Sequence, residues 1–396
     1  MPNPPPSAPA PAVPHAPGSP NASVPQVALT TPAFPKVYPN PLTPDQNLQK
    51  VLDDAIKAGP GTSWTVPVAI VFLDPGASSR PMAQFKGPEM DYSASLLKVA
   101  AMYAAFELRK TVRAVAAELG TQTTQQDLLR DVARFLDPKI LAMAATIPAL
   151  NGIANTNALP QYAKVFDVVA ATSGAGFTVS FKDTYWKSGG TPGDSNASAM
   201  QLMIEQSVNL KAAQVIQGLG YGYLNGALTS AGFLSGGVGL WLGGDYSRDI
   251  TTGKSQYPYF RVPSVNDQQV AQGATVLALA REFTLIADDL LVDAASCAEM
   301  REVTALAVSF GEVFLNRGSG PLHFKITNTK VGLGPLKSGS LVSSEASLVL
   351  HDSGRKFVVA WQNLQGSLDP TSHVVRDVLD KFTPGASTTA TTPATP

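Results

Sequence analysis

The stretch 91–110 is apolar on nearly every side of a helix, and yet it carries a lysine near its start. Lys98 is the only charged residue between Tyr92 and Phe106. A helix without a polar face is usually buried, and a buried ammonium group is costly unless it has a partner or loses its proton. This stretch therefore predicts a central buried helix in which the amine of Lys98 has a chemical role.

Ser95 is the expected partner of the Lys98 amine, because residues three apart share one face of a helix. Burial lowers the pKa of a lysine, and a neutral amine can take the proton of a serine hydroxyl that attacks a carbonyl carbon. The alternative is a lysine whose stem is buried while its amine reaches solvent. The same spacing recurs at Ser353 and Lys356 in an expected hairpin turn, so the spacing alone does not identify a nucleophile.

The order of patterns along the chain predicts an α+β fold. Helical periodicity occurs at 48–56, 91–110 and from about 371, helical patterns dominate 111–304, and strand patterns occur at 66–73, 81–85, 323–327, 332–336, 341–350 and 356–364. We expect one antiparallel sheet built from both chain ends and flanked by helices, with an all-α subdomain inserted in the middle.

Four parts are expected along the chain. Residues 1–42 are rich in Pro and Ala and predict a disordered tail, as do residues 384–396. Residues 43–110 and 305–383 together form the expected α/β subdomain. Residues 111–304 form the expected helical subdomain.

Composition narrows the classes of function. The 396 residues are 44% hydrophobic and 15% charged, so the chain can bury a large core. With a net charge of −1 and no long basic run, nucleic acid is not an expected partner. The sequence contains no apolar run of about 18 residues, so no transmembrane segment is predicted. Cys297 reads as a small buried residue, and the four histidines lack the spacing of a metal site, so we expect neither a metal nor another cofactor.

Two motifs in this order resemble those of the penicillin-binding protein and serine β-lactamase superfamily: Ser95-Leu96-Leu97-Lys98 at the head of the buried helix, and Lys337-Ser338-Gly339 on a late strand. The arrangement over about 44–383 is most similar to class A β-lactamases. A second Lys-Ser-Gly occurs at 187–189, but only the later one precedes two strands and a helix, as in the family.

The resemblance implies roles for these residues. Ser95 would be acylated, with Lys98 as its base. Lys337 would attract a substrate carboxylate, and Ser338 would hydrogen-bond to it. Gly339 would let substrate lie close to an edge strand. The backbone N–H groups of Ser95 and Ser340 would form the oxyanion hole.

The family's middle motif, Ser-x-Asn, has two candidates in this chain. In Asp194-Ser195-Asn196 the serine is one place late, so Ser195 would carry a proton to the leaving group while Asn196 keeps the family's asparagine; the alternative is a helix N-cap. The second candidate is Tyr223-Leu224-Asn225, which resembles the Tyr-x-Asn of class C β-lactamases.

Class A enzymes also place a glutamate after the middle motif to activate water. No glutamate occurs here between Glu205 and Glu282, and the carboxylates in that interval are Asp245, Asp249 and Asp267. Because hydrolysis of an acyl-enzyme needs a second base, we expect slow deacylation, with Asp245 as the first substitute.

The resemblance implies a serine hydrolase that acts on a small-molecule amide or ester, with a β-lactam as the leading substrate. The alternatives are a peptidoglycan D,D-peptidase or an esterase of the same fold, and a non-catalytic penicillin-binding-like protein. Because the family acts outside the inner membrane, we expect a periplasmic or secreted protein, although no signal peptide is visible. The sequence does not set the oligomeric state.

Overall fold

The computed structural model describes residues 29–73, 79–120, 123–171, 176–247, 257–316, 323–365 and 369–383. Its largest sheet has six strands in the order β1-β3-β2-β14-β13-β12. The strands are β1 (Leu42–Pro44), β2 (Val68–Phe72), β3 (Arg80–Phe85), β12 (Phe324–Pro335), β13 (Leu341–His351) and β14 (Lys356–Gln365). Neighbours pair antiparallel except β1 with β3. The predicted α+β fold, with a sheet built from both chain ends, is confirmed.

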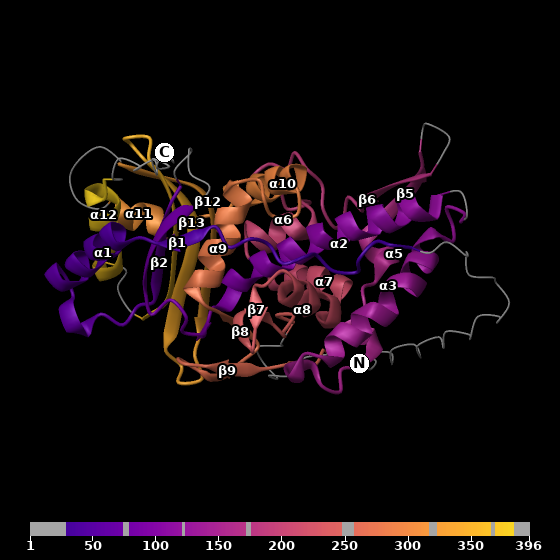
Figure 1. Cartoon of the computed structure of the whole chain (residues 1–396), viewed down its shortest axis with the longest axis horizontal. Coiled ribbons are helices and arrows are strands. Elements are labelled where there is room, and N and C mark those ends of the chain that lie inside the picture. The colour runs from indigo at the N-terminus through magenta and orange to yellow at the C-terminus, as the bar shows by residue number, and fades with distance from the viewer. Residues whose placement is uncertain are drawn as a thin grey trace, which may run out of the picture.

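Helices cover both faces of this sheet (Figure 1). On one face lie α1 (Gln46–Ala58), α11 (Gly311–Leu315) and α12 (Asp369–Lys381); on the other lie α9 (Val276–Ala287), α10 (Ala294–Ala305) and the start of α2 (Lys98–Leu119). Side chains alternate along β2, so Val68, Ile70 and Phe72 join the cluster beside α1 while Ala69 and Val71 join the opposite one. Since both faces are covered, all of β2 is buried.

Helix α2 is the centre of the molecule, as the sequence predicted. Every residue from Lys98 to Arg109 is buried. The helix contacts the sheet side through its start and is surrounded further along by other helices: α3 (Leu128–Ala145), α6 (Ala199–Ile204), α7 (Asn209–Leu219) and α8 (Tyr221–Ser230). A helix enclosed in this way needs no polar face.

The middle of the chain is mainly helical, but it is not all-α as expected. It also contains α4 (Asn155–Ala158), α5 (Tyr162–Val165) and the hairpin of β5 (Phe166–Ala170) with β6 (Phe177–Phe181). A second sheet joins β4 (Asp91–Tyr92), β11 (Gln272–Ala274), β8 (Val238–Leu242) and β7 (Leu234–Ser235). Strands β9 (Val262–Ser264) and β10 (Gln268–Val270) form another hairpin. Strands this short give almost no periodic signal, which is why the sequence did not reveal them.

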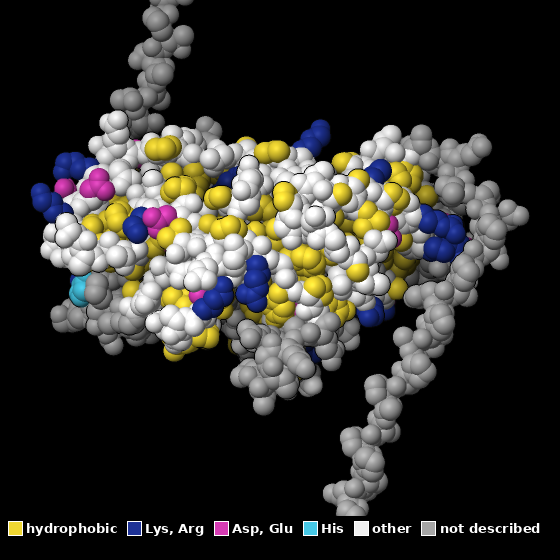
Figure 2. All heavy atoms as spheres, turned by 90° about the horizontal axis from the view of Figure 1, so that it is seen from below, with side chains coloured by type: hydrophobic (Ala, Val, Ile, Leu, Met, Phe, Trp, Pro, Cys, Tyr) yellow, Lys and Arg dark blue, Asp and Glu magenta, His cyan; other side chains and the backbone are white. Residues whose placement is uncertain are grey.

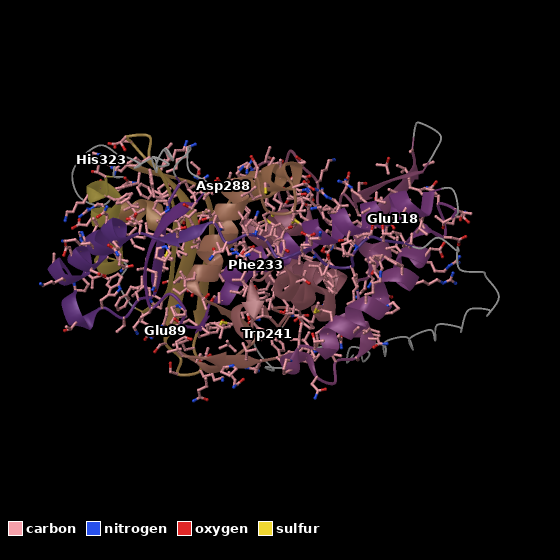
Figure 3. The ribbon with its side chains drawn as sticks, in the orientation of Figure 1. Glu89, Glu118, Phe233, Trp241, Asp288 and His323 are labelled. Atoms are coloured by element: carbon pink, nitrogen blue, oxygen red, sulfur yellow. The ribbon has the colours of Figure 1, made fainter. Side chains whose placement is uncertain are left out.

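The segment 29–42, which was predicted as part of a disordered tail, is packed along the molecule (Figure 1). Phe34 stacks on Tyr223 with ring centroids 5.5 Å apart, and the Tyr38 hydroxyl donates to Glu107 at 2.7 Å. At the far end of α2, Glu118 accepts the backbone N–H of Thr30 at 2.6 Å (Figure 3). The predicted end of the tail at residue 42 was wrong. The Pro-rich composition of this segment masks the few aromatic residues, Phe34 and Tyr38, that pack against the rest of the protein. The rest of that tail, 1–28, and the tail 384–396 lie outside the described residues.

The described surface agrees with the small net charge. On the face in Figure 2, Lys and Arg side chains occur in small separated groups among hydrophobic and neutral side chains. Of the helices that the structure describes, none has the length and apolar character needed to cross a bilayer.

Candidate active site

A strained turn presents Ser95 to solvent. The 3₁₀ turn η2 (Ala94–Leu97) leads directly into α2, and Ala94 at its start has φ of 47°. This left-handed conformation is uncommon for a residue with a Cβ, and such strain tends to concentrate at functional sites. Ser95 is partly exposed while Ala94 and Leu96 are buried. The serine thus lies at the head of the central helix, as predicted.

Lys98 is completely buried, and its amine is held by the segment that begins α7. Its Nζ donates to the carbonyl oxygen of Ser207 at 2.6 Å and to Asn209 Oδ1 at 2.9 Å, and it lies 3.3 Å from Ser207 Oγ. Burial, together with the nearby charge of Lys330, lowers the pKa of Lys98 to about 6. At neutral pH the amine is therefore mostly unprotonated, which is the form that can accept a proton.

A second buried lysine reaches Ser207 from the side of the sheet. Lys330 lies on β12, and its Nζ donates to Ser207 Oγ at 2.9 Å. Burial lowers the pKa of Lys330 to about 7, against the opposing effect of Glu345 on the neighbouring strand. Ser207 Oγ thus lies between two amines whose pKa values are both shifted toward neutrality.

Gly332 allows β12 to approach the turn that carries Ser95. A Cβ at this position would lie 2.3 Å from the carbonyl oxygen of Ser93 and 2.8 Å from the backbone nitrogen of Leu96. No side chain fits there, so glycine is required for the contact. Strand β12 is the last strand of the sheet, and it packs against the turn η2 that carries Ser95.

Ser207-Val208-Asn209 is the Ser-x-Asn triplet that lies at the site, and the sequence reasoning missed it. The predicted Ser195 and Asn196 lie in an exposed loop at the opposite end of α6, where Asn196 N–H donates to Asp194 Oδ1 at 2.8 Å. The structure therefore moves the middle motif to Ser207 and Asn209. An unmodified Ser-x-Asn match was available in the sequence, and its position directly before a helix was the signal that could have found it.

The second candidate for the middle motif is also displaced from the site. Tyr223 is fully buried inside α8 and stacks on Phe34. Asn225 lies in the same helix, where its Nδ2 donates to the carbonyl oxygen of Leu242 at 3.0 Å. Both side chains serve the core.

Lys337, Ser338, Gly339 and Ser340 form the turn between β12 and β13 and do not lie on a strand as predicted. Of the four, Lys337 borders the cavity beside Asn209 and Tyr246, whereas the amines that bond to Ser207 are those of Lys98 and Lys330. The Lys337 amine donates to the backbone oxygens of Asp267 at 3.1 Å and Gln269 at 3.0 Å, which fastens the β9–β10 hairpin. Within the turn, Ser340 N–H donates to Ser338 Oγ at 3.4 Å. The sequence patterns divided this strand into 323–327 and 332–336, whereas β12 runs through both and contains Lys330-Val331-Gly332.

Of the three aspartates considered as a second base, the two that the structure describes are hydrogen-bonded to residues other than Lys98. Asp245 is buried, with Oδ2 accepting from Gln217 at 2.6 Å and Oδ1 from the Ser247 hydroxyl at 2.8 Å. Asp267 Oδ1 accepts the backbone N–H of Lys337. Asp249 lies outside the described residues. The neighbour of Asp245, Tyr246, contacts Lys98 instead.

A cavity of about 330 Å³ opens beside Asn209 and Tyr246. Its walls also include Tyr92, Tyr259, Arg261 and residues 335–337, where β12 ends and the turn to β13 begins. Its size is at the lower end of the range of small-molecule sites. Among the described residues, no group of three or more His, Cys, Asp or Glu side chains could hold a metal ion.

Comparison with known proteins gives a likeness of fold. No family model matches the chain, and no curated protein matches it. The chain is similar to a solved class A β-lactamase from Bacteroides cellulosilyticus DSM 14838, with 13% identity over 85% of this chain and 95% of that one and a TM-score of 0.46. A β-lactamase from Chitinophaga pinensis DSM 2588 shares 15% identity over 85% and 97%, with a TM-score of 0.46. A variant of PBP-A, solved as its acyl-enzyme complex with penicillin G, shares 16% identity over 86% and 96%, with a TM-score of 0.44. These proteins are of the superfamily that the motifs resemble.

Proposed function

We propose that this protein is a serine hydrolase of the penicillin-binding protein and serine β-lactamase type, which forms an acyl-enzyme on Ser95. One observation carries the proposal: the amines of Lys98 and Lys330 lie 3.3 Å and 2.9 Å from Ser207 Oγ, beside the turn that presents Ser95. A nucleophile next to a base that a further group orients is the common arrangement for covalent catalysis.

Acylation follows from this arrangement. As Ser95 Oγ attacks the carbonyl carbon, its proton passes to the neutral amine of Lys98. The backbone N–H groups of Ser95 and of Leu333, which follows Gly332, donate to the oxygen that becomes negative. The proton then passes through Ser207 to the leaving nitrogen or oxygen as its bond to the carbonyl carbon breaks. Leu333 thereby takes the role first expected for Ser340.

The substrate class is a small amide or ester, and a β-lactam is the leading choice. A protonated Lys330, together with Arg261 in the cavity wall, favours a molecule that carries a carboxylate. Asn209 has its Oδ1 on Lys98 and lies at the cavity, where its amide can meet the substrate. For such substrates we propose a location in the periplasm or outside the cell.

A second candidate is a penicillin-binding protein or D,D-peptidase that keeps its acyl group for long periods. The three partners that hold the Lys98 amine are neutral, and both oxygens of Asp245 are engaged elsewhere. Water at an acylated Ser95 would then lack a carboxylate base, so deacylation would be slow.

Labelling with a fluorescent penicillin, read by intact-protein mass, tests the proposal. We expect a Ser95 adduct in the wild type and in the control Ser353→Ala, whose serine lies in the β13–β14 turn, and none in Ser95→Ala. An adduct that persists favours the second candidate, whereas rapid loss with product release favours a β-lactamase. Equal labelling of Ser95→Ala and wild type would overturn the assignment of the nucleophile.

A further inference from the structure

Tyr246 lies against the amine of the proposed base. The Lys98 Nζ lies 4.6 Å from the centre of the Tyr246 ring, over its face. The loop that brings the ring there has an unusual backbone, because Tyr246 has φ of 65°. Asp245 anchors this loop by accepting hydrogen bonds from Gln217 and Ser247. The ring is therefore held in place and does not fill the position by chance.

The same side chain also holds the turn before Ser95. The Tyr246 hydroxyl donates to the carbonyl oxygen of Ala94 at 2.9 Å. Ala94 is the residue with φ of 47°, and a strained conformation persists only where surrounding contacts fix it. One tyrosine thus touches both the base and the residue that sets the direction of the nucleophile.

We propose that Tyr246 is a positioning residue for the Ser95 and Lys98 pair: its ring stabilises the ammonium that forms on Lys98, and its hydroxyl holds Ala94 in place. This inference rests on the proposed acylation of Ser95. It assigns to an aromatic ring the electrostatic support that a carboxylate would otherwise give.

The electrostatic reasoning starts from a neutral amine. During acylation Lys98 gains a proton, and the ring's negative face attracts the new charge more strongly than it attracted the neutral amine. A contact that strengthens in the transition state raises the acylation rate. Lys330, the other titratable group beside Lys98, repels the same charge. Around Tyr246 lie Tyr92, Tyr221 and Tyr259, which are uncharged at neutral pH.

The first test measures Lys98 itself and does not need activity. The ¹³Cε resonance of Lys98, assigned by its loss in Lys98→Gln, is titrated by NMR in wild type, Tyr246→Leu and Tyr246→Phe. Leucine keeps the site apolar but removes the ring face, so we expect the pKa of Lys98 to fall by about one pH unit, which is about 1.4 kcal/mol. Tyr246→Phe keeps the ring and should leave that pKa within about 0.3 of wild type.

The second test measures acylation with the fluorescent penicillin. We expect the rate to fall about tenfold in Tyr246→Leu, and severalfold in Tyr246→Phe through loss of the bond to Ala94. Tyr221→Phe is the matched control, because its hydroxyl has no hydrogen-bond partner among the described residues, and it should behave like wild type.

The outcomes separate the two proposals. An unchanged Lys98 titration in Tyr246→Leu overturns the role of the ring, and a wild-type acylation rate in Tyr246→Phe overturns the role of the hydroxyl. If wild type forms no Ser95 adduct, the proposed function fails, while the NMR titration still decides whether the ring stabilises the ammonium. If Tyr246→Leu does not fold, Tyr246→Met replaces it in the Lys98 titration as the variant without a ring, and Tyr246→Phe still decides the role of the hydroxyl through the acylation rate.

Discussion

Two lysines that share one serine set the pH behaviour expected of the site. Lys98 must be neutral to accept a proton, and burial lowers its pKa to about 6. Lys330 must be protonated to attract an anion, and burial lowers its pKa to about 7. As the pH rises, the active neutral form of Lys98 becomes more abundant and the active protonated form of Lys330 becomes less abundant. Ser207 lies between the two amines.

The acylation rate should depend on pH in a way that reveals which substrate is used. With a neutral ester the rate should rise about tenfold for each pH unit below about 6 and then level off, because the neutral form of Lys98 becomes complete. With a carboxylate-bearing β-lactam it should fall again above about 7, as Lys330 loses its charge. Second-order acylation rates from pH 4.5 to 9 test this, and a falling limb with both substrates would contradict the division of roles.

The proposed anion-binding role of Lys330 can be tested by a direct comparison of two variants. Lys330→Ala should lower acylation by a carboxylate-bearing β-lactam about 100-fold, because it removes both the charge and the partner of Ser207. Lys337→Ala should change it less than about threefold, since Lys337 is exposed and holds the backbone of the β9–β10 hairpin. The reverse order of effects would restore the assignment first made from the sequence.

At the scale of elements, the site depends on the contact between an edge strand and the turn before α2. Strand β12 passes within van der Waals distance of that turn only because Gly332 has no side chain. The contact brings Lys330 and the backbone of Leu333 to the same side as Ser95. A small displacement of β12 should therefore lower the acylation rate before it destabilises the rest of the sheet.

Two glycine substitutions on the β12–β13 hairpin separate these effects. Gly332→Ala places a methyl group 2.3 Å from the Ser93 carbonyl oxygen, so it should cost about 1–3 kcal/mol of unfolding free energy and lower acylation at least about tenfold. Gly339→Ala, at φ of 88° with open space around it, should cost about 1 kcal/mol and leave acylation unchanged. Urea unfolding and acylation rates measured on both variants test this. Unchanged acylation in Gly332→Ala would contradict the proposed contact.

At the scale of the molecule, the segment 29–42 joins the helical region to the sheet. Thr30 bonds to the far end of α2, Tyr38 bonds to Glu107, and Leu42 pairs with Arg80 on β3. The same segment covers Tyr223 through Phe34. It thus contributes to the core along most of the length of the molecule.

Removing an anchor of this segment should destabilise the protein without altering its chemistry. Phe34→Ala should lower the free energy of unfolding by about 3 kcal/mol, because a nearly buried ring is lost from the core. Val37→Ala, where the side chain is 71% exposed, should change it by less than about 0.5 kcal/mol. Urea denaturation compares the two. If both variants matched wild type, the segment would not contribute to stability as described.

Local patterns in the sequence were enough for the fold class and for the head of the central helix. Apolar residues along 91–110 require burial wherever that segment lies, although its first residues form β4 and the 3₁₀ turn with Ser95 and only the part from Lys98 is the predicted helix. The order of helices and strands likewise limits how one sheet can form from both chain ends. These features depend on neighbours in the chain, and so the sequence alone determined them.

Only the tertiary structure decided which distant motifs reach Ser95. The chain contains several triplets of the Ser-x-Asn and Lys-x-Gly kinds, and the triplet by itself does not tell which of them lies beside Lys98. Packing selects Ser207 and Lys330. The hydrogen bonds from the amines of Lys98 and Lys330 to Ser207 form only when the segment before α7 and strand β12 meet at the start of α2. Tyr246 has no motif at all, and its place over Lys98 follows from a loop anchored through Asp245. Contacts between segments far apart in the chain are set by how the whole core closes, and no local spacing encodes them.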